Sequence, residues 1–315
     1  ARRYAAIRGT ETPKIGRKTI FVFAADHGVT AEGVSAYPAE VTRQMVLNFL
    51  SGGAAINVLA RHVGAEVAVV DIGVDHEFGD LPGLIGRKIA RGTKNMAQGP
   101  SMSRSQAEDA LQTGIDLARD YSSKGVDIFG AGDMGIGNTT ASAAILAVYG
   151  NEPIETLTGR GTGIDDLKLR HKVEIVKQAI RINRPDPADP IDVLAKVGGF
   201  EIAGIAGLIL GAAASRRPVV IDGLISGAAA VIALKLHKTV KDYIFTSHRS
   251  QEPGHRICFQ LLDQPPLFDF EMRLGEGTGA ALGISLVDAA VKIYSEMATF
   301  ASAGVAAKIE TKASQ

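Results

Sequence analysis

Five apolar runs, each ending in or near glycine, aspartate or serine, constrain the fold of this chain more than any other feature. Their apolar residues are continuous rather than alternating, which is typical of strands buried on both faces. Helical patterns separate the runs, and this alternation predicts a parallel sheet with crossover helices. We therefore expect an α/β fold, a Rossmann-like parallel sheet with helices on both faces. The runs are TIFVFAADHG (19–28), EVAVVDIG (66–73), VDIFGAGD (126–133), PVVIDG (218–223) and DYIFTSH (242–248).

The two ends of the chain have a different pattern. The tail LVDAAVKIYSEMATFASAGVAAKI (286–309) is amphipathic and predicts a helix, which could pack against a helix at the N-terminus. We expect a large catalytic domain over residues 17–284 and a small helical subdomain from residues 1–16 and 285–315. The chain begins without Met, in a segment that reads like the end of a helix, so we expect further residues upstream.

Composition narrows the class of function. The chain has 315 residues, 46% of them hydrophobic, and a formal net charge of zero, so neither nucleic acid nor an anionic membrane is an expected partner. No window of 18 or more residues is uninterruptedly apolar, which argues against a membrane span. The single cysteine, Cys258, excludes an internal disulfide framework and fits a cytoplasmic protein. We expect Cys258 to be a buried structural thiol.

The stretch RLGEGTGA (273–280) places one carboxylate among three glycines, directly before an apolar run. Glycines beside a charged side chain let a substrate approach the backbone closely. Glu276 is therefore a candidate general base. The alternative is a glycine-rich turn with a solvated glutamate before a helix.

The loop GAGDMGIGNTTASAA (130–144) follows a strand and opens a helix, and its first glycines match GxGxxG. Free amides at such a helix start favour a phosphate group. The loop could be a dinucleotide fingerprint, but it is longer, and Asn138-Thr139-Thr140 adds donors suited to one terminal phosphate. The alternative is a tight turn with an Asn or Thr N-cap.

Two later loops could also hold a phosphate. TGRGTGIDD (158–166) precedes a clear helix, and its alternative interpretation is a capped helix entry. Lys172, about two turns into that helix, would ordinarily be solvated. SHRSQEPGHR (247–256) follows a strand and offers hydroxyl and guanidinium donors from Ser247, Arg249 and Ser250.

A metal site is not expected. Asp26 and His27 follow the first strand and could recruit other side chains, but no HxH, HExxH or Asp-rich ligand spacing occurs. Those other side chains are Asp133, Asp222, His248 and His255. The segment around Tyr37-Pro38, Gln44 and Met45 could instead line an apolar pocket for a flat ring.

Together these loops resemble one family, the nicotinate-nucleotide–dimethylbenzimidazole phosphoribosyltransferases of cobalamin nucleotide-loop assembly. Their order is that of the family, and they cover about residues 19 to 285. Many matches in register are far more specific than one glycine motif. The segments are AADHGV (24–29), EVTRQMVLNFLSGGAAINVLA (40–60), DMGIGNTT (133–140), TGRGTGIDD (158–166), GGFEIAGIAGLILGAA (198–213), SHRSQEPGH (247–255) and RLGEGTGAAL (273–282).

The resemblance implies a reaction and roles for residues. Nicotinate mononucleotide would give its 5-phosphoribosyl group to 5,6-dimethylbenzimidazole with inversion, yielding α-ribazole 5′-phosphate and nicotinate. Glu276 matches the family's catalytic base, and Asp133 and Lys172 fall on active-site positions. The phosphate and ribose contacts would be Gly135, Gly137, Asn138, Thr139, Gly161, Thr162 and Ser250. The base pocket would be formed by Tyr37, Gln44, Met45, Leu274 and Gly275.

The resemblance also implies a homodimer, while metal and cofactor are not expected. Two departures from the family stand out. Many relatives have Glu in the place of Asp133, and a shorter side chain moves the carboxylate by about one methylene. The Lys-Pro-x-Gly-Ser-Leu-Gly motif that usually lies upstream of the equivalent of Arg2 does not occur in this sequence.

Two other functions remain open at the level of sequence. A nucleotide-dependent oxidoreductase built on GAGDMG needs an acidic residue that ends the next strand. Glu152 and Glu155 lie nearby, but no convincing strand precedes them. A non-catalytic relative would hold the mononucleotide only and would not need Glu276.

Overall fold

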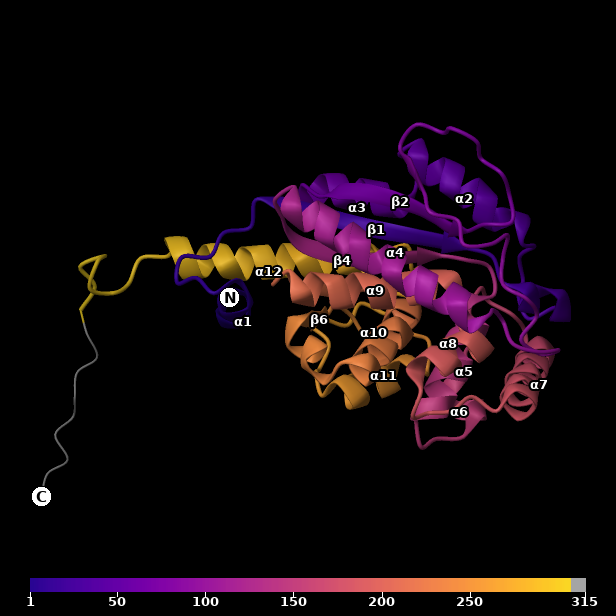
Figure 1. The fold of residues 1–315 in the computed structure, drawn as a ribbon. Helices are drawn as coiled ribbons and strands as arrows, with labels where there is room; N and C mark the ends of the chain where they lie inside the picture. Colours follow the sequence, from indigo (N-terminus) through magenta and orange to yellow (C-terminus); the bar gives the residue numbers. More distant parts are fainter. Residues whose placement is uncertain (307–315) are drawn as a thin grey trace, which may run out of the picture.

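The computed structural model describes residues 1–306, and in that part of the chain six strands form one parallel sheet (Figure 1). The order is β3-β2-β1-β4-β5-β6, which is the strand order of a Rossmann fold. The α/β prediction is therefore confirmed. The strands are β1 (Arg17–Ala25), β2 (Glu66–Gly73), β3 (Leu84–Gly86), β4 (Val126–Met134), β5 (Val219–Ile221) and β6 (Ile244–Thr246).

The order in which strands are added to the sheet changes direction between β1 and β4. β1 pairs with β2 on one side and with β4 on the other, so that Phe23 lies opposite both Val70 and Asp133. Loops that leave the carboxyl ends of two such strands diverge and open a crevice between them. This topology puts the residues after β1 and β4 at a ligand site.

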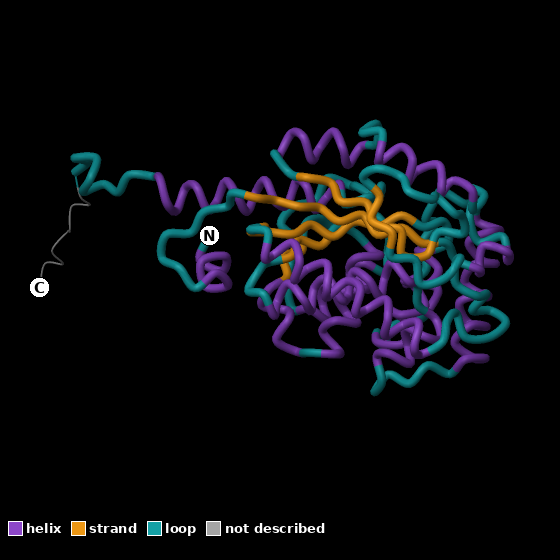
Figure 2. The backbone as a smooth tube through the Cα atoms, turned by 45° about the horizontal axis from the view of Figure 1, so that its top comes forward, coloured by secondary structure: helices purple, strands orange, loops and turns teal. Residues whose placement is uncertain are grey.

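Helices cover both faces of the sheet, as Figure 2 shows. On one face Phe21 and Phe23 of β1 pack with α4, α5, α9 and α10, while on the other Ile20 and Val22 pack with α2, α3 and α12. Both faces of β1 are buried, which explains its continuous apolar run. The helices are α2 (Glu40–Leu50), α3 (Ala55–Val63), α4 (Arg104–Ser123), α5 (Asn138–Tyr149), α6 (Ile154–Leu157), α7 (Asp166–Asn183), α8 (Pro190–Val197), α9 (Phe200–Ala214), α10 (Leu224–Leu236), α11 (His255–Leu262) and the 3₁₀ turns η1 (Gly28–Glu32) and η2 (Lys238–Tyr243).

The first helix and the last long helix pack together beside the sheet. Tyr4 of α1 (Arg2–Arg8) is buried in the same cluster as Val287 and Val291 of α12 (Thr278–Glu296). The hydroxyl of Ser295 also donates to the Pro13 carbonyl at 2.9 Å. Residue 285, the expected domain boundary, lies inside α12. The division of the chain into two domains stays a prediction.

The helix expected over 286–309 is shorter than predicted at its C-terminal end. α12 already begins at Thr278 and stops at Glu296. Thr299 and Ser302 then exchange hydrogen bonds between side chains and amides, a local arrangement that competes with helix. Residues 307–309 lie outside the described part.

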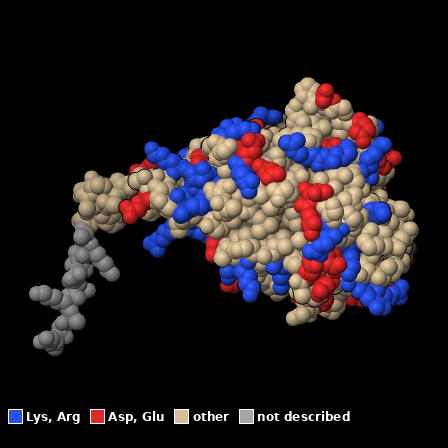
Figure 3. Space-filling model, in the orientation of Figure 1, with Lys and Arg blue, Asp and Glu red and all other residues tan. Residues whose placement is uncertain are grey.

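Charges of both signs are interspersed on the face of the molecule that Figure 3 shows. Within residues 1–306, no helix combines the length and apolar character needed to cross a membrane. Cys258 is fully buried, in agreement with a structural thiol.

Candidate active site

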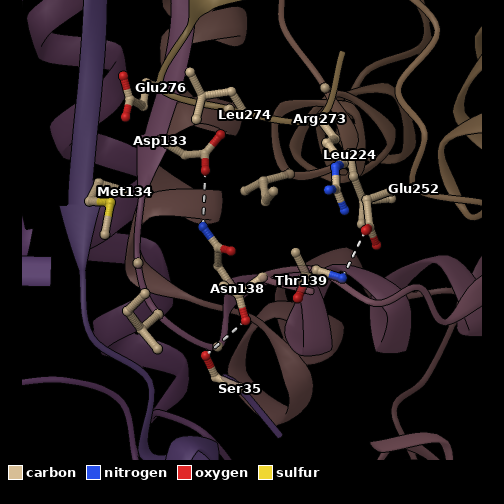
Figure 4. A pocket seen from close by; sticks show the side chains of 18 of the residues that line it. Ser35, Asp133, Met134, Asn138, Thr139, Leu224, Glu252, Arg273, Leu274 and Glu276 are labelled. Atoms are coloured by element: carbon tan, nitrogen blue, oxygen red, sulfur yellow. Dashed lines mark hydrogen bonds between the residues drawn. The ribbon is translucent and has the colours of Figure 1, made fainter. Parts of the chain in front are cut away.

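A cavity of about 560 Å³ opens where the loops after β1 and β4 diverge (Figure 4). Loops from four other parts of the chain complete its wall, around residues 161, 223, 250 and 275. The cavity brings together nearly all of the residues predicted from the sequence. Those that line it are Tyr37, Met45, Asp133, Gly135, Gly137, Asn138, Thr139, Gly161, Thr162, Ser250, Leu274, Gly275 and Glu276.

Two predicted residues do not line this cavity. Gln44 is exposed on α2, so the structure does not support its place in the base pocket. On a helix, neighbouring residues are turned about 100° apart, which explains how Met45 reaches the cavity when Gln44 does not. Lys172 lies directly behind the wall, where it contacts Thr139.

Glu276 is held in an unusual backbone conformation immediately before α12. Its φ is 63°, between Gly275 at 83° and Gly277 at 91°. A left-handed φ is uncommon for a residue with a Cβ atom and is found where the surroundings enforce it. The side chain is only 8% exposed, and its Oε2 accepts from the Ile56 amide at 3.4 Å. Burial raises the pKa of Glu276, which suits a general base.

The loop that carries Glu276 is clamped by Asp222, a fully buried residue at the end of β5. The two carboxylate oxygens of Asp222 accept from the amides of Gly277 at 2.9 Å and Gly279 at 2.7 Å. Burial raises the pKa of Asp222 to about 7, although these amide hydrogen bonds oppose the rise. His248 lies 3.7 Å from Asp222, and burial lowers the pKa of this imidazole to about 4, which leaves it neutral.

The N-terminus of α5 has a similar glycine turn but no clamp. Gly137 has φ of 99°, and no side chain caps the helix. Within the described residues, the amides of Gly137 and Thr139 have no hydrogen-bond acceptor. Such amides together with the helix dipole favour an anion. The N-cap by Asn or Thr, which the sequence left open, does not occur.

Lys172 supplies a buried positive charge next to this helix start. Its ammonium donates to the Thr139 hydroxyl at 2.8 Å and to the Gly159 carbonyl at 3.2 Å, and the residue is 1% exposed. Burial lowers the pKa of Lys172 to about 8, while Glu252 works in the opposite direction. The alternative of a solvated lysine is therefore wrong.

The glycine loop before α7 and the loop before α11 meet at the same end of the cavity. The Gly161 amide donates to Glu252 Oε1 at 2.8 Å, and the Glu252 amide donates to the Ser250 hydroxyl at 3.2 Å. Thr162 accepts from the Ala36 amide at 3.0 Å, which ties this region to the loop after β1. Of the two aspartates in the first loop, Asp165 caps α7 by accepting from the Lys168 amide at 2.9 Å.

Asp133 ends β4 between the two glycine turns. Its Oδ2 accepts from the Asn138 side-chain amide at 3.0 Å, as Figure 4 shows. Burial raises the pKa of Asp133 well above its usual range, and the nearby carboxylates of Asp222 and Glu201 add to the rise. A raised pKa favours the protonated form of a carboxyl group, which can donate a hydrogen bond.

The candidate metal ligands have other partners. His27 Nε2 lies 2.7 Å from Glu201 Oε1 in a fully buried pair, and Asp26 Oδ2 accepts from the Asp75 amide at 2.8 Å. Burial opposes a charge on His27, but Glu201 outweighs it and the pKa of His27 is raised. No group of three or more His, Cys, Asp or Glu side chains suited to a metal occurs among residues 1–306.

The oxidoreductase alternative lacks its acidic residue. The element after α5 is the short helix α6 rather than a strand, and Glu155 lies on it. Glu152 forms an ion pair with Arg256 instead. A dinucleotide site requires a strand that ends in an acidic residue about 20 residues after the glycine loop. The next strand, β5, begins only at Val219, and Asp222 after it accepts from the amides of Gly277 and Gly279.

Sequence reasoning missed several wall residues. Most lie within one to four positions of predicted ones in the same loops, so proximity to those loops was the available signal. Glu252 is the acidic member of this group and lies at the Gly161 amide. The others include Val34, Val41, Met134, Ile136, Leu224, Ile225 and Arg273.

The arrangement has three parts with different chemistry. Uncapped amides and a buried ammonium lie at one end, and a buried carboxylate with a raised pKa lies near the other glycine turn. The wall between them is largely apolar. Such a cavity can hold a phosphorylated substrate beside an apolar ring and remove one proton.

Comparisons with known proteins agree with this arrangement. Residues 1–305 match a family described as phosphoribosyltransferase. The chain is 61% identical over 305 residues to the nicotinate-nucleotide–dimethylbenzimidazole phosphoribosyltransferase of Geobacter metallireducens, with 97% of this chain and 86% of the relative covered. The relative of that name from Geobacter sulfurreducens is 59% identical over 306 residues, covering 97% of this chain and 87% of its own.

The fold agrees as well. The crystal structure of CobT from Thermus thermophilus matches with a TM-score of 0.92 and 48% identity, covering 96% of this chain and 91% of that one. Fold, cavity and sequence thus point to the same assignment, an enzyme that transfers a phosphoribosyl group. The chain belongs to the nicotinate-nucleotide–dimethylbenzimidazole phosphoribosyltransferase family.

Proposed function

We propose that this protein transfers the 5-phosphoribosyl group of nicotinate mononucleotide to 5,6-dimethylbenzimidazole with inversion at C1′. The products are α-ribazole 5′-phosphate and nicotinate. The observation that carries the proposal is the pairing, in one cavity, of an uncapped helix start beside Lys172 with the buried carboxylate of Glu276. The names of the relatives from Geobacter supply the substrate class.

The phosphate of the mononucleotide binds at the N-terminus of α5 in this proposal. The amides of Gly137 and Thr139 donate to its oxygens, and Lys172 provides a positive charge from behind Thr139. Ser250 lines the same end of the cavity and offers its hydroxyl. Fixing the phosphate there would hold C1′ of the ribose at a set distance from the acceptor ring.

The chemical step forms one bond and breaks one at C1′. A ring nitrogen of the benzimidazole attacks C1′ from the face opposite to nicotinate, whose C–N bond breaks. The pyridine nitrogen takes that electron pair and leaves neutral, so the leaving group needs no acid. The attacking ring becomes cationic, and Glu276 accepts the proton from its second nitrogen. A general base of this kind contributes about 10²–10⁴-fold to the rate.

Asp133 has a different role from Glu276. The pKa of Asp133 is raised by burial, and its Oδ2 already accepts from the Asn138 side-chain amide. We assign Asp133, with Asn138, to hydrogen bonds with the ribose hydroxyl groups rather than to proton removal.

The acceptor ring binds against the apolar wall. Tyr37, Met45, Met134 and Leu274 line the cavity and provide flat or flexible apolar contacts. Such a wall fits the methyl groups and ring faces of 5,6-dimethylbenzimidazole.

We further propose that the protein is a homodimer. α12 extends beyond the body of the molecule (Figure 1), and apolar side chains there lie exposed. Contiguous exposed apolar side chains of this kind mark protein contacts. The side chains are Ile293 (57% exposed), Tyr294 (48%), Met297 (69%) and Phe300 (68%). A cytoplasmic location stays a prediction from the single cysteine.

The test is an assay of the wild type and Glu276→Gln with both substrates in the presence of EDTA. Nicotinate and α-ribazole 5′-phosphate are separated by chromatography. We expect equal amounts of both products from the wild type and a loss of about 10²-fold or more in Glu276→Gln, with unchanged binding of the mononucleotide.

Wild-type protein that binds the mononucleotide without turnover would contradict the proposal and favour a non-catalytic binder. Turnover by Glu276→Gln at the wild-type rate would leave the transferase but remove Glu276 as its base.

A further inference from the structure

Glu252 is a buried carboxylate at the phosphate end of the cavity to which the reaction just described gives no role. Glu252 is 7% exposed, and its Oε1 accepts from the Gly161 amide at 2.8 Å. Oε2 is buried and has no hydrogen-bond partner within the described residues. A buried carboxylate oxygen without a partner is costly, so its retention calls for a compensating role.

Lys172 is a buried positive charge on the same glycine loop, and Glu252 acts on its pKa. Two of the three donors of its ammonium are used, by the Thr139 hydroxyl and the Gly159 carbonyl. No ion pair within 4.0 Å joins Glu252 and Lys172 in the part of the chain that is described. The Gly159–Gly161 turn connects the two groups, because the Gly159 carbonyl accepts from Lys172 and the Gly161 amide donates to Glu252. In a buried region, attraction between opposite charges persists beyond contact distance.

We propose that Glu252 is a positioning residue for phosphate binding, which anchors the Gly159–Gly163 loop through the Gly161 amide and supplies the counter-charge of Lys172. The inference rests on the proposed function, because it explains how Lys172 keeps the charge that binds the phosphate at that site. In Figure 4 the Glu252 carboxylate lies on the same side of the cavity as Thr139.

A carboxylate is needed because an amide would satisfy only half of this role. Glutamine could accept from the Gly161 amide, but it carries no charge. The groups facing Lys172 from the neighbouring elements are the Thr139 hydroxyl of α5, the Gly159 carbonyl and Glu252. Of these only Glu252 is charged, and it alone raises the pKa of Lys172, which burial lowers to about 8. A neutral lysine would bind phosphate weakly.

The experiment compares Glu252→Gln, which keeps the acceptor and removes the charge, with Glu252→Asp, which keeps the charge on a shorter side chain. Glu174→Gln is the matched control, because Glu174 lies on the same helix as Lys172 and its side chain is 68% exposed beside Lys177. The pH titration of Lys172, which is too buried for a chemical reagent, is read from the ¹³Cε chemical shift of the unliganded protein labelled at lysine, and Lys172→Met assigns the signal. Mononucleotide binding is measured by calorimetry between pH 6 and 9.

In Glu252→Gln, the titration of Lys172 is expected to move to lower pH by about half a pH unit or more, since a nearby opposite charge is lost. Mononucleotide binding at pH 8 weakens by about threefold or more for the same reason. Glu252→Asp and Glu174→Gln keep the wild-type titration.

An unchanged Lys172 titration in Glu252→Gln would overturn the proposal. Tighter mononucleotide binding by that variant would also overturn it, because Glu252 would then be an anion that the phosphate must displace. The NMR titration needs no turnover, so its outcome is separate from failure of the transferase assay. A shifted titration with no wild-type turnover would remove the proposed function and leave the Glu252–Lys172 coupling.

Discussion

Two helices start in nearly the same way at this cavity, but their first amides are used differently. α5 follows Gly135-Ile136-Gly137, and α12 follows Gly275-Glu276-Gly277, with left-handed glycines at both N-caps. At α12 the amides of the N-cap and of the second helical residue donate to Asp222. At α5 the equivalent amides have no acceptor in the described residues.

The α12 start is filled by the protein itself and is rigid, whereas the α5 start is free to bind a ligand. An internal carboxylate fills the α12 start, which fixes the residue between its glycines, and that residue is Glu276. The α5 start keeps its donors and dipole for an external anion. The same local geometry can thus serve a general base or a phosphate, depending on whether the protein supplies its own anion.

Asp222→Ala removes the carboxylate that fills the α12 start, and it has the largest expected effect. The amides of Gly277 and Gly279 lose their acceptor, so Glu276 is no longer held at its working position. We expect kcat to fall by about 10²-fold with KM for the mononucleotide nearly unchanged, and the free energy of unfolding to fall by about 1–3 kcal/mol. Steady-state kinetics and urea unfolding measure the two effects.

Asp288→Ala is the control for Asp222→Ala. Asp288 is also buried on α12 and pairs with Lys18 at 2.7 Å, but it does not line the cavity. It should lower stability without lowering kcat. Equal kcat losses in both variants would show that any weakening of α12 has this effect and that the clamp has no special role.

Lys172→Met weakens phosphate binding at the α5 start. The phosphate loses a charged partner while the general base stays in place. KM for the mononucleotide should rise by about 10-fold to 100-fold, from a charged hydrogen bond of about 1.5–3 kcal/mol, and kcat should change much less. Lys177→Met, an exposed change on the same helix, should keep the wild-type KM. A loss confined to kcat would place Lys172 with the base instead.

The pH profile of kcat/KM tests the two helix starts separately. A group at one start sets the acidic limb of the profile, and a group at the other sets the alkaline limb. Glu276 must be ionised, and burial raises its pKa, so activity falls as the pH drops through that value. Lys172 must be protonated, so activity falls as the pH rises through about 8. About a tenfold loss per pH unit is expected on each limb. An alkaline limb that survives in Lys172→Met would contradict its assignment.

Asp133→Asn has the smallest expected effect. Burial raises the pKa of Asp133, which favours its neutral form, and asparagine can also donate a hydrogen bond. We expect a loss of kcat/KM of only about fivefold or less, far below the loss for Glu276→Gln. A loss of about 10²-fold would show that Asp133 works as an ionised group. Kinetics of the two variants at pH 7 decide the point.

Local sequence pattern predicted the α/β fold and the loops that form the cavity, and the family resemblance added many of the individual wall residues. Continuous apolar runs identify strands buried on both faces, and glycine-rich strand ends identify the loops that converge at one edge. The three-residue strand β3 was missed because it is short and half-exposed, with no continuous apolar run.

The pairings that tune the site could not be predicted from local pattern. His27 meets Glu201 across 174 positions, and Gly161 meets Glu252 across 91 positions. Asp222 was a candidate metal ligand in the sequence, whereas in the fold it accepts from two amides of the α12 start. Only the assembled sheet decides which loops approach one another, so the partner of a buried charge stays hidden until then.

The most direct test of the central difference between the two helix starts is a crystal structure with nicotinate mononucleotide bound. The account predicts phosphate oxygens about 3 Å from the amides of Gly137 and Thr139. It also predicts that Asp222 still accepts from Gly277 and Gly279. A phosphate bound at the α12 start, or away from both helix starts, would contradict it.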